Sequence, residues 1–219
     1  MSGNGVIPST LHIELLSDAT FSWGEPAPGV ADIEIERDSL GLPLIRGRTL
    51  RGLLRDSWLS MAEHFPELAS AAERVLGRSR ALEESCRLRI GDAVLPESVR
   101  RAVKAALERE AHPLTPGTIL DAFTTLRHQT AEDRKTGAPA ETTLRTSRVA
   151  LRGLVLQSQL TWLEGYRPGN DDLRVLALVA LATRHGGLAR NRGRGHLRIT
   201  LDGDRSRTCV LAAGEEVRQ

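Results

Sequence analysis

The chain has few of the residues on which several classes of protein depend. Its two cysteines and six histidines among 219 residues show neither CxxC nor HExxH spacing, which argues against a disulfide framework and a zinc site. The longest apolar run, residues 175–182, falls far short of the roughly 18 residues of a membrane span. No charged-then-apolar signal segment opens the sequence. We therefore expect a cytoplasmic protein with no membrane partner.

Aromatic residues and lysines are also scarce. Only 3% of the residues are aromatic, so base stacking of the kind used by RNA-recognition motifs has few side chains available. Of the 30 basic residues only Lys104 and Lys135 are lysines. Arginine suits forked contact with phosphates, but an arginine-biased genome explains the same ratio. Because the net charge is only +2, only the placement of the arginines along the chain can indicate whether they serve to bind nucleic acid.

Hydrophobic periodicity predicts strands mixed with helices. Strands are expected at residues 10–16, 87–90, 148–163 and 196–201, and helices at 49–64, 67–82, 96–111 and 170–184. The first helix would be capped by Thr49 and the last by Asn170 or Asp171. The apolar residues of the long strand change from odd-numbered to even-numbered positions at Gly153, and this switch of parity predicts a bulge there. Residues 115–120 read as loop or strand, residues 130–143 should project, and the tail is polar. This order suits an α+β fold of the ferredoxin-like kind with insertions, in one domain.

Two stretches, residues 43–55 and 184–201, contain arginines and no acidic residue. One such stretch is more often a solvated basic face, but two with interspersed glycines favour contact with nucleic acid. Neither matches G-x-G-x-x-G or a Walker A motif, so a nucleotide cofactor is not indicated. The candidate RNA-binding residues here are Arg46, Arg48, Thr49, Arg51, Arg55, Arg190, Arg192 and Arg194, with Gly47, Gly186, Gly187, Gly193 and Gly195 allowing close backbone approach.

Three motifs carry a resemblance to a known family. Residues 41–52, GLPLIRGRTLRG, resemble the G-x-P-x-I-P-G-S-S-L-K-G motif of the RAMP superfamily of CRISPR-associated proteins, with arginine and Arg-Thr replacing the proline and paired serines. Residues 186–195 resemble its C-terminal glycine-rich loop. Residues 133–138 and 144–149, DRKTGA and LRTSRV, are similar to the thumb region of one member, the repeated backbone subunit of type III effector complexes. The resemblance spans residues 11–201.

The resemblance implies a single RAMP domain over residues 1–219, with a ferredoxin-like or RRM-like palm, inserted helices and a projecting β-hairpin thumb. The palm would comprise about residues 10–60, 85–95 and 148–202, the helical insertion about 66–112, and the thumb about 121–148. It adds Arg134, Lys135 and Arg145 to the RNA-binding candidates. The implied partners are guide RNA, target RNA, further copies of the chain in a helical filament, and the other type III subunits: a large polymerase-like subunit, a small subunit and other RAMP subunits.

The same resemblance implies an endoribonuclease of antiviral defence. In the backbone subunit a loop aspartate beside each displaced nucleotide supports metal-dependent cleavage of target RNA at regular intervals. Asp32, which precedes Arg37-Asp38 with matching spacing, is the candidate catalytic residue and metal ligand. Its carboxylate would hold Mg²⁺ or Mn²⁺ while the RNA's own 2′-OH attacks in line. Glu34 and Glu36 either assist the metal or belong to an exposed strand.

Three alternatives stay open. The chain could be a non-catalytic RNA-binding subunit of the same kind of complex, or a metal-independent endoribonuclease that processes guide RNA with histidine or tyrosine residues. An unrelated interaction domain would show no salt-dependent RNA binding. Asp18 and Asp38 read as turn residues.

Overall fold

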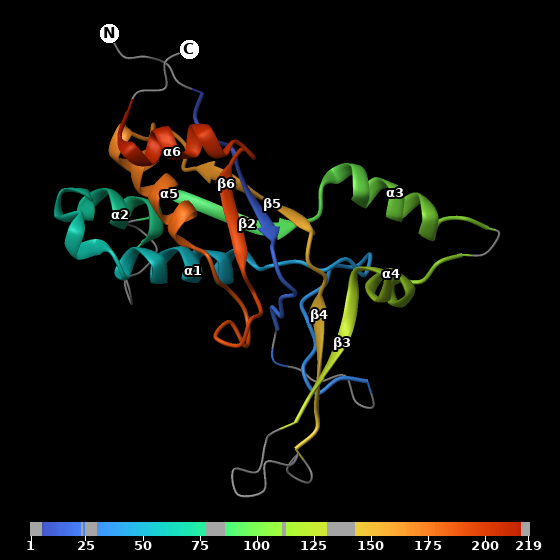
Figure 1. Ribbon diagram of the computed structural model, residues 1–219. Coiled ribbons are helices and arrows are strands. Elements are labelled where there is room, and N and C mark those ends of the chain that lie inside the picture. Colours follow the sequence, from blue (N-terminus) through green and yellow to red (C-terminus); the bar gives the residue numbers. More distant parts are fainter. Residues whose placement is uncertain are drawn as a thin grey trace, which may run out of the picture.

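The fold is built on a four-stranded antiparallel sheet with strand order β2-β5-β1-β6. The computed structural model describes residues 6–22, 24, 30–77, 86–110, 113–130 and 143–215. The strands are β1 (Thr10–Leu15), β2 (Leu88–Val94), β5 (Val155–Trp162) and β6 (Leu197–Leu201), and α1 (Gly47–Leu59) and α5 (Asn170–Ala182) cross over between them. Without its insertions the chain therefore runs β-α-β-β-α-β. This topology confirms the predicted α+β, ferredoxin-like palm (Figure 1).

The main core lies between this sheet and the helices on one of its faces. Leu11, Ile13 and Leu15 of β1 alternate with more exposed residues and are almost wholly buried, as the period of a strand requires. They pack with side chains of α1, α5 and α2 (Ala69–Leu76). A further helix, α6 (Arg205–Ala213), packs against α5. The expected polar tail was assigned no helix, but Asp204 begins one here by accepting the N–H of Arg207.

A second, smaller core forms around Leu42, Leu95, Val103 and Ile119. It joins α3 (Glu97–Leu107) to α4 (Pro116–Phe123), away from the other helices in Figure 1. The predicted helical insertion at 66–112 is thus split, since α2 belongs to the main core and α3 to the second one. The expectation of loop or strand at 115–120 was wrong: the Thr115 hydroxyl accepts the N–H of Thr118 and begins a helix there.

A two-stranded hairpin, β3 (Thr124–Gln129) and β4 (Arg145–Ala150), projects from the palm (Figure 1). It is inserted between β2 and β5, where the thumb was expected. The single long strand predicted over 148–163 is instead two strands in different sheets. Gly153, with φ +86°, lies in the turn between them rather than in a bulge. The switch of parity marks the change of sheet.

The helix starts also differ from the predicted ones. Helix α1 begins at Gly47, whose N–H donates to the Asp92 carboxylate at 2.8 Å, so Thr49 is no cap. Helix α5 follows Gly169, whose N–H donates to Asp172. Two single 3₁₀ turns, Ala62–His64 and Pro66–Leu68, separate α1 from α2. Among the described helices, none is long and apolar enough to span a membrane.

Candidate nucleic-acid interface

Residues 18–21 form the junction between the hairpin and the glycine loop (residues 186–195). Ala19 exchanges two backbone hydrogen bonds with Ala150 of β4, at 3.1 and 2.8 Å. On the other side, the Thr20 carbonyl accepts the N–H of Leu188 at 2.9 Å, and the Asp18 carbonyl accepts that of Gly195 at 2.8 Å. The hairpin and the glycine loop are therefore held next to each other by one short segment.

The glycine loop has its shape because three of its glycines touch backbone or core atoms. A Cβ on Gly195, which has φ +67°, would lie 1.9 Å from the Gly186 carbonyl oxygen. One on Gly187 would lie 2.5 Å from the Thr20 oxygen, and one on Gly186 would lie 2.7 Å from Leu53 of α1. A larger residue at Gly187 or Gly195 would collide with backbone at a left-handed φ, whereas one at Gly186 would have to displace the Leu53 side chain. The closed base leaves the middle of the loop exposed to solvent.

A groove of about 730 Å³ lies between the glycine loop and the hairpin. Four of the predicted RNA-binding arginines line it: Arg145 from β4, and Arg190, Arg192 and Arg194 from the loop. Its other described lining residues include no aspartate or glutamate. Forked guanidinium groups in a groove without carboxylates attract phosphate. We call this feature the arginine groove.

The arginines at the start of α1 have a different environment. The Arg46 guanidinium pairs with Glu36 at 2.8 Å and with Asp92 at 3.1 Å, and the hydrogen bonds to Glu36 and then Asp92 raise the pKa of Arg46. Arg51 donates to the Leu88 carbonyl at 3.2 Å. At the N-terminus of α1 the favourable negative charge therefore comes from carboxylates of the protein itself rather than from a bound phosphate.

The remaining candidates on α1 lie on its solvent side. Arg48 and Arg55 line a shallow pocket with Gly47, and Thr49 is exposed. The two arginines have no hydrogen bond or ion pair with another residue that the structure describes. Arg134 and Lys135 lie outside the described residues.

Asp32 lies beside the hairpin, exposed to solvent. Its Oδ2 accepts the N–H of Thr146 in β4 at 2.7 Å, and its own N–H donates to the Thr146 carbonyl at 2.9 Å. The next residue, Ile33, lines the arginine groove. The Asp32 carboxylate is thus held in place through its Oδ2. Asp32 is also the sequence neighbour of a residue that lines the arginine groove.

The reading of Glu34 and Glu36 as residues of an exposed strand was wrong, because each carboxylate is buried in an ion pair. Glu34 pairs with Arg148 of β4 at 3.0 Å, with both side chains 9% exposed, and Glu36 pairs with Arg46. Removing a charge from water is costly unless it is paired, and these carboxylates already have arginine partners. Within the described part of the chain no three potential metal ligands gather.

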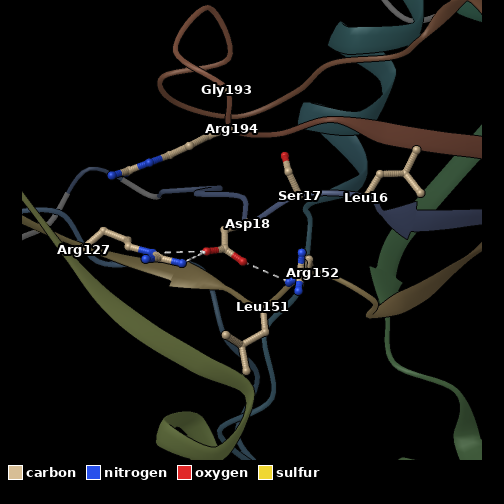
Figure 2. A pocket seen from close by; sticks show the side chains of 8 residues that line it. All are labelled: Leu16, Ser17, Asp18, Arg127, Leu151, Arg152, Gly193 and Arg194. Carbon is tan, nitrogen blue, oxygen red and sulfur yellow. Dashed lines mark hydrogen bonds and ion pairs between the residues drawn. The ribbon is translucent and has the colours of Figure 1, made fainter.

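Asp18 is the residue that sequence reasoning undervalued. Its Oδ2 accepts two hydrogen bonds from Arg127 of β3, at 3.1 and 2.6 Å, and its Oδ1 accepts the N–H of Arg152 at 3.1 Å (Figure 2). It links palm to hairpin and is no turn residue. Its side-chain partners lie 109 and 134 positions away, so no local signal could have found them. Asp38 does accept the N–H groups of Leu40 and Leu42 within its own turn through Oδ1, and its Oδ2 also pairs with the distant Arg100 of α3.

Comparisons with known proteins agree with this architecture. The family model of the RAMP superfamily matches residues 12–198, and the chain belongs to that superfamily. A chain of the type III-B Cmr-β complex in its apo state superposes with a TM-score of 0.64 at 13% identity, covering 90% of this chain and 98% of that one. A chain of the same complex bound to cognate target RNA gives 0.63 at 10% identity with the same coverage. At these identities the likeness shows the fold. No curated protein matches.

Proposed function

We propose that the chain is a guide-RNA-binding subunit of a type III CRISPR effector complex, of the repeated backbone kind. The observation that carries the proposal is the arginine groove: four arginines and no described acidic residue, between a glycine loop and a hairpin, in a RAMP fold. Type III-B Cmr-β subunits have the same fold, and one of those complexes was solved with target RNA. Copies of the chain and other subunits of the complex would be its protein partners.

The groove is suited to phosphate and ribose rather than to stacked bases. Among its described lining residues there is no aromatic side chain, so base stacking has no platform there. Binding through arginine and phosphate releases counterions, and the affinity should therefore fall steeply with salt. It should depend little on RNA sequence, because phosphate contacts carry no sequence information.

Target cleavage is the finer part of the proposal and depends on Asp32. Its Oδ1 has no partner among the described residues, so this oxygen could ligate one divalent cation, with water and RNA phosphate completing the shell. Mg²⁺ or Mn²⁺ held there would offset negative charge on the phosphate. The chain's own contribution is positional: the Thr146 N–H fixes Oδ2, and the backbone pairing of Asp32 with β4 fixes the residue against the hairpin.

The test is the substitution Asp32→Ala in the complex assembled with guide RNA and partner subunits. Cleavage of complementary target should fall about 100-fold or more, while binding of guide and target stays unchanged. Asp56→Ala is the matched control, because Asp56 is an exposed aspartate on α1 whose side chain makes no described contact. It should cleave like the parent.

Two results would change the assignment. Unaltered cleavage by the Asp32→Ala complex would leave the chain a non-catalytic RNA-binding subunit. Cleavage of precursor guide RNA by the isolated chain in the presence of a chelator would instead make it a guide-processing endoribonuclease.

A further inference from the structure

We propose a second RNA phosphate site, adjoining the arginine groove, in the pocket at the base of the hairpin. The inference rests on the proposed RNA-binding function. The pocket, about 810 Å³, is lined by Leu16, Ser17, Asp18, Arg127, Leu151, Arg152, Gly193 and Arg194 (Figure 2). We call it the junction pocket. None of the sequence motifs pointed to Arg127 or Arg152.

Four separate segments build the junction pocket. Ser17 follows β1, Arg127 lies on β3, Arg152 lies in the turn between β4 and β5, and Arg194 comes from the glycine loop. Figure 2 shows Arg194 above the other two arginines, with Asp18 at the centre. A ligand that enters the pocket would therefore meet guanidinium groups from more than one wall.

The single acidic residue does not cancel the positive charge of the pocket. Both Asp18 oxygens are already used, Oδ2 by Arg127 and Oδ1 by the N–H of Arg152. The guanidinium groups of Arg152 and Arg194 have no carboxylate partner among the described residues. With one aspartate against three arginines, the pocket carries a net positive charge. Asp18 thus orients Arg127 and leaves the other two cations free for an anion.

A phosphodiester is the anion that fits best. Guanidinium groups bind phosphate oxygens in pairs, and the Ser17 hydroxyl, which accepts the N–H of His196 at 2.9 Å, still has a proton to donate. Among the described residues that line the pocket there is no aromatic side chain to receive a free nucleotide's base.

The shared position of Arg194 favours RNA over an acidic protein segment. Arg194 lines both the junction pocket and the arginine groove, so the two sites meet at the glycine loop. A strand in the groove would pass the loop at Gly193, whose position has nothing within 4 Å of a Cβ. Its next phosphates would then reach Arg152 and Arg127.

Arg152→Ala is the sharpest test, because only the backbone N–H of Arg152, and not its side chain, bonds to Asp18. The substitution leaves the link between palm and hairpin in place. With single-stranded RNA and the full chain, the dissociation constant should rise roughly fivefold to tenfold. The plot of log affinity against log salt should become shallower by about 0.7.

Arg205→Ala provides the control for loss of one positive charge. Arg205 is exposed at the start of α6 and has no partner among the described residues. Equal RNA affinity and equal salt slopes for the Arg152→Ala and Arg205→Ala variants would overturn the proposal that the junction pocket binds RNA phosphate. If substitutions in the arginine groove still weakened binding, the proposed function would stand. If the unaltered chain bound no RNA at all, the proposed function itself would fail. If the Arg152→Ala chain lost binding to a partner subunit but kept its RNA affinity, the junction pocket would be a protein-binding site and not an RNA site.

Discussion

The two arginine-rich stretches of this protein differ in what surrounds them. At the start of α1, Arg46 is paired with Glu36 and Asp92, and Arg51 donates to a backbone carbonyl. In the glycine loop, Arg190 and Arg192 face a groove whose described lining contains no carboxylate. In the first stretch Arg46 is held in ion pairs of the fold, whereas the glycine loop of the second stretch leaves Arg190 and Arg192 exposed and without a carboxylate partner among the described residues; Arg198, after the loop, does pair with Glu14.

The difference shows that a stretch without acids in the sequence can still be surrounded by acids in space. Glu36 and Asp92 lie 10 and 46 positions from Arg46. The described residues that line the arginine groove with the glycine loop are instead uncharged ones such as Thr20 and Ser147. We therefore expect the loop to dominate RNA binding and the start of α1 to contribute more to stability.

The largest effect should come from Gly195→Ala. The new methyl group would collide with the Gly186 carbonyl at a left-handed φ, so the loop base must open and the three loop arginines must move. We expect RNA affinity to fall on the order of 100-fold and thermal stability to decrease. Gly52→Ala on α1 is the control. Its Cβ meets nothing within 4 Å, and it should stabilise the helix by about 0.5–1 kcal/mol with unchanged RNA binding.

The double substitution of Arg190 and Arg192 by alanine should have the next largest effect. Both side chains are exposed and line the arginine groove, so the fold should survive, which thermal melting would check. RNA affinity should fall about 30-fold, and the salt slope should decrease by about 1.4, or 0.7 for each phosphate contact. Full retention of affinity would remove the groove as the RNA site.

The smallest effect on RNA should come from Arg46→Ala. Because Arg46 already satisfies Glu36 and Asp92, RNA affinity should change less than about twofold. Stability should fall by about 2 kcal/mol in denaturant titration, since the buried Glu36 carboxylate loses its partner. A loss of RNA affinity as large as that from the loop substitutions would restore the simpler prediction that both stretches bind RNA alike.

Local patterns predicted most of the palm. The alternation in β1 and the apolar spacing of α1 are set by neighbouring residues, and so were found. The caps of α1 and α5 were missed for different reasons: Asp92 reaches Gly47 from 45 positions away, whereas Asp172 lies only three residues after Gly169 and was passed over in favour of its neighbours. The turn at Gly153 was mistaken for a bulge, because a change of parity looks the same whether a strand bulges or enters another sheet.

The sequence by itself determined the order of the palm elements, the superfamily motifs and the glycines that allow a tight loop, since each depends on a few consecutive residues. Only the tertiary structure decided which charges remain available. It buried Glu34 against Arg148, engaged Asp18 with Arg127 and left Asp32 exposed at one oxygen. The physical reason is that ion pairs form wherever folding brings opposite charges together, at any separation along the chain.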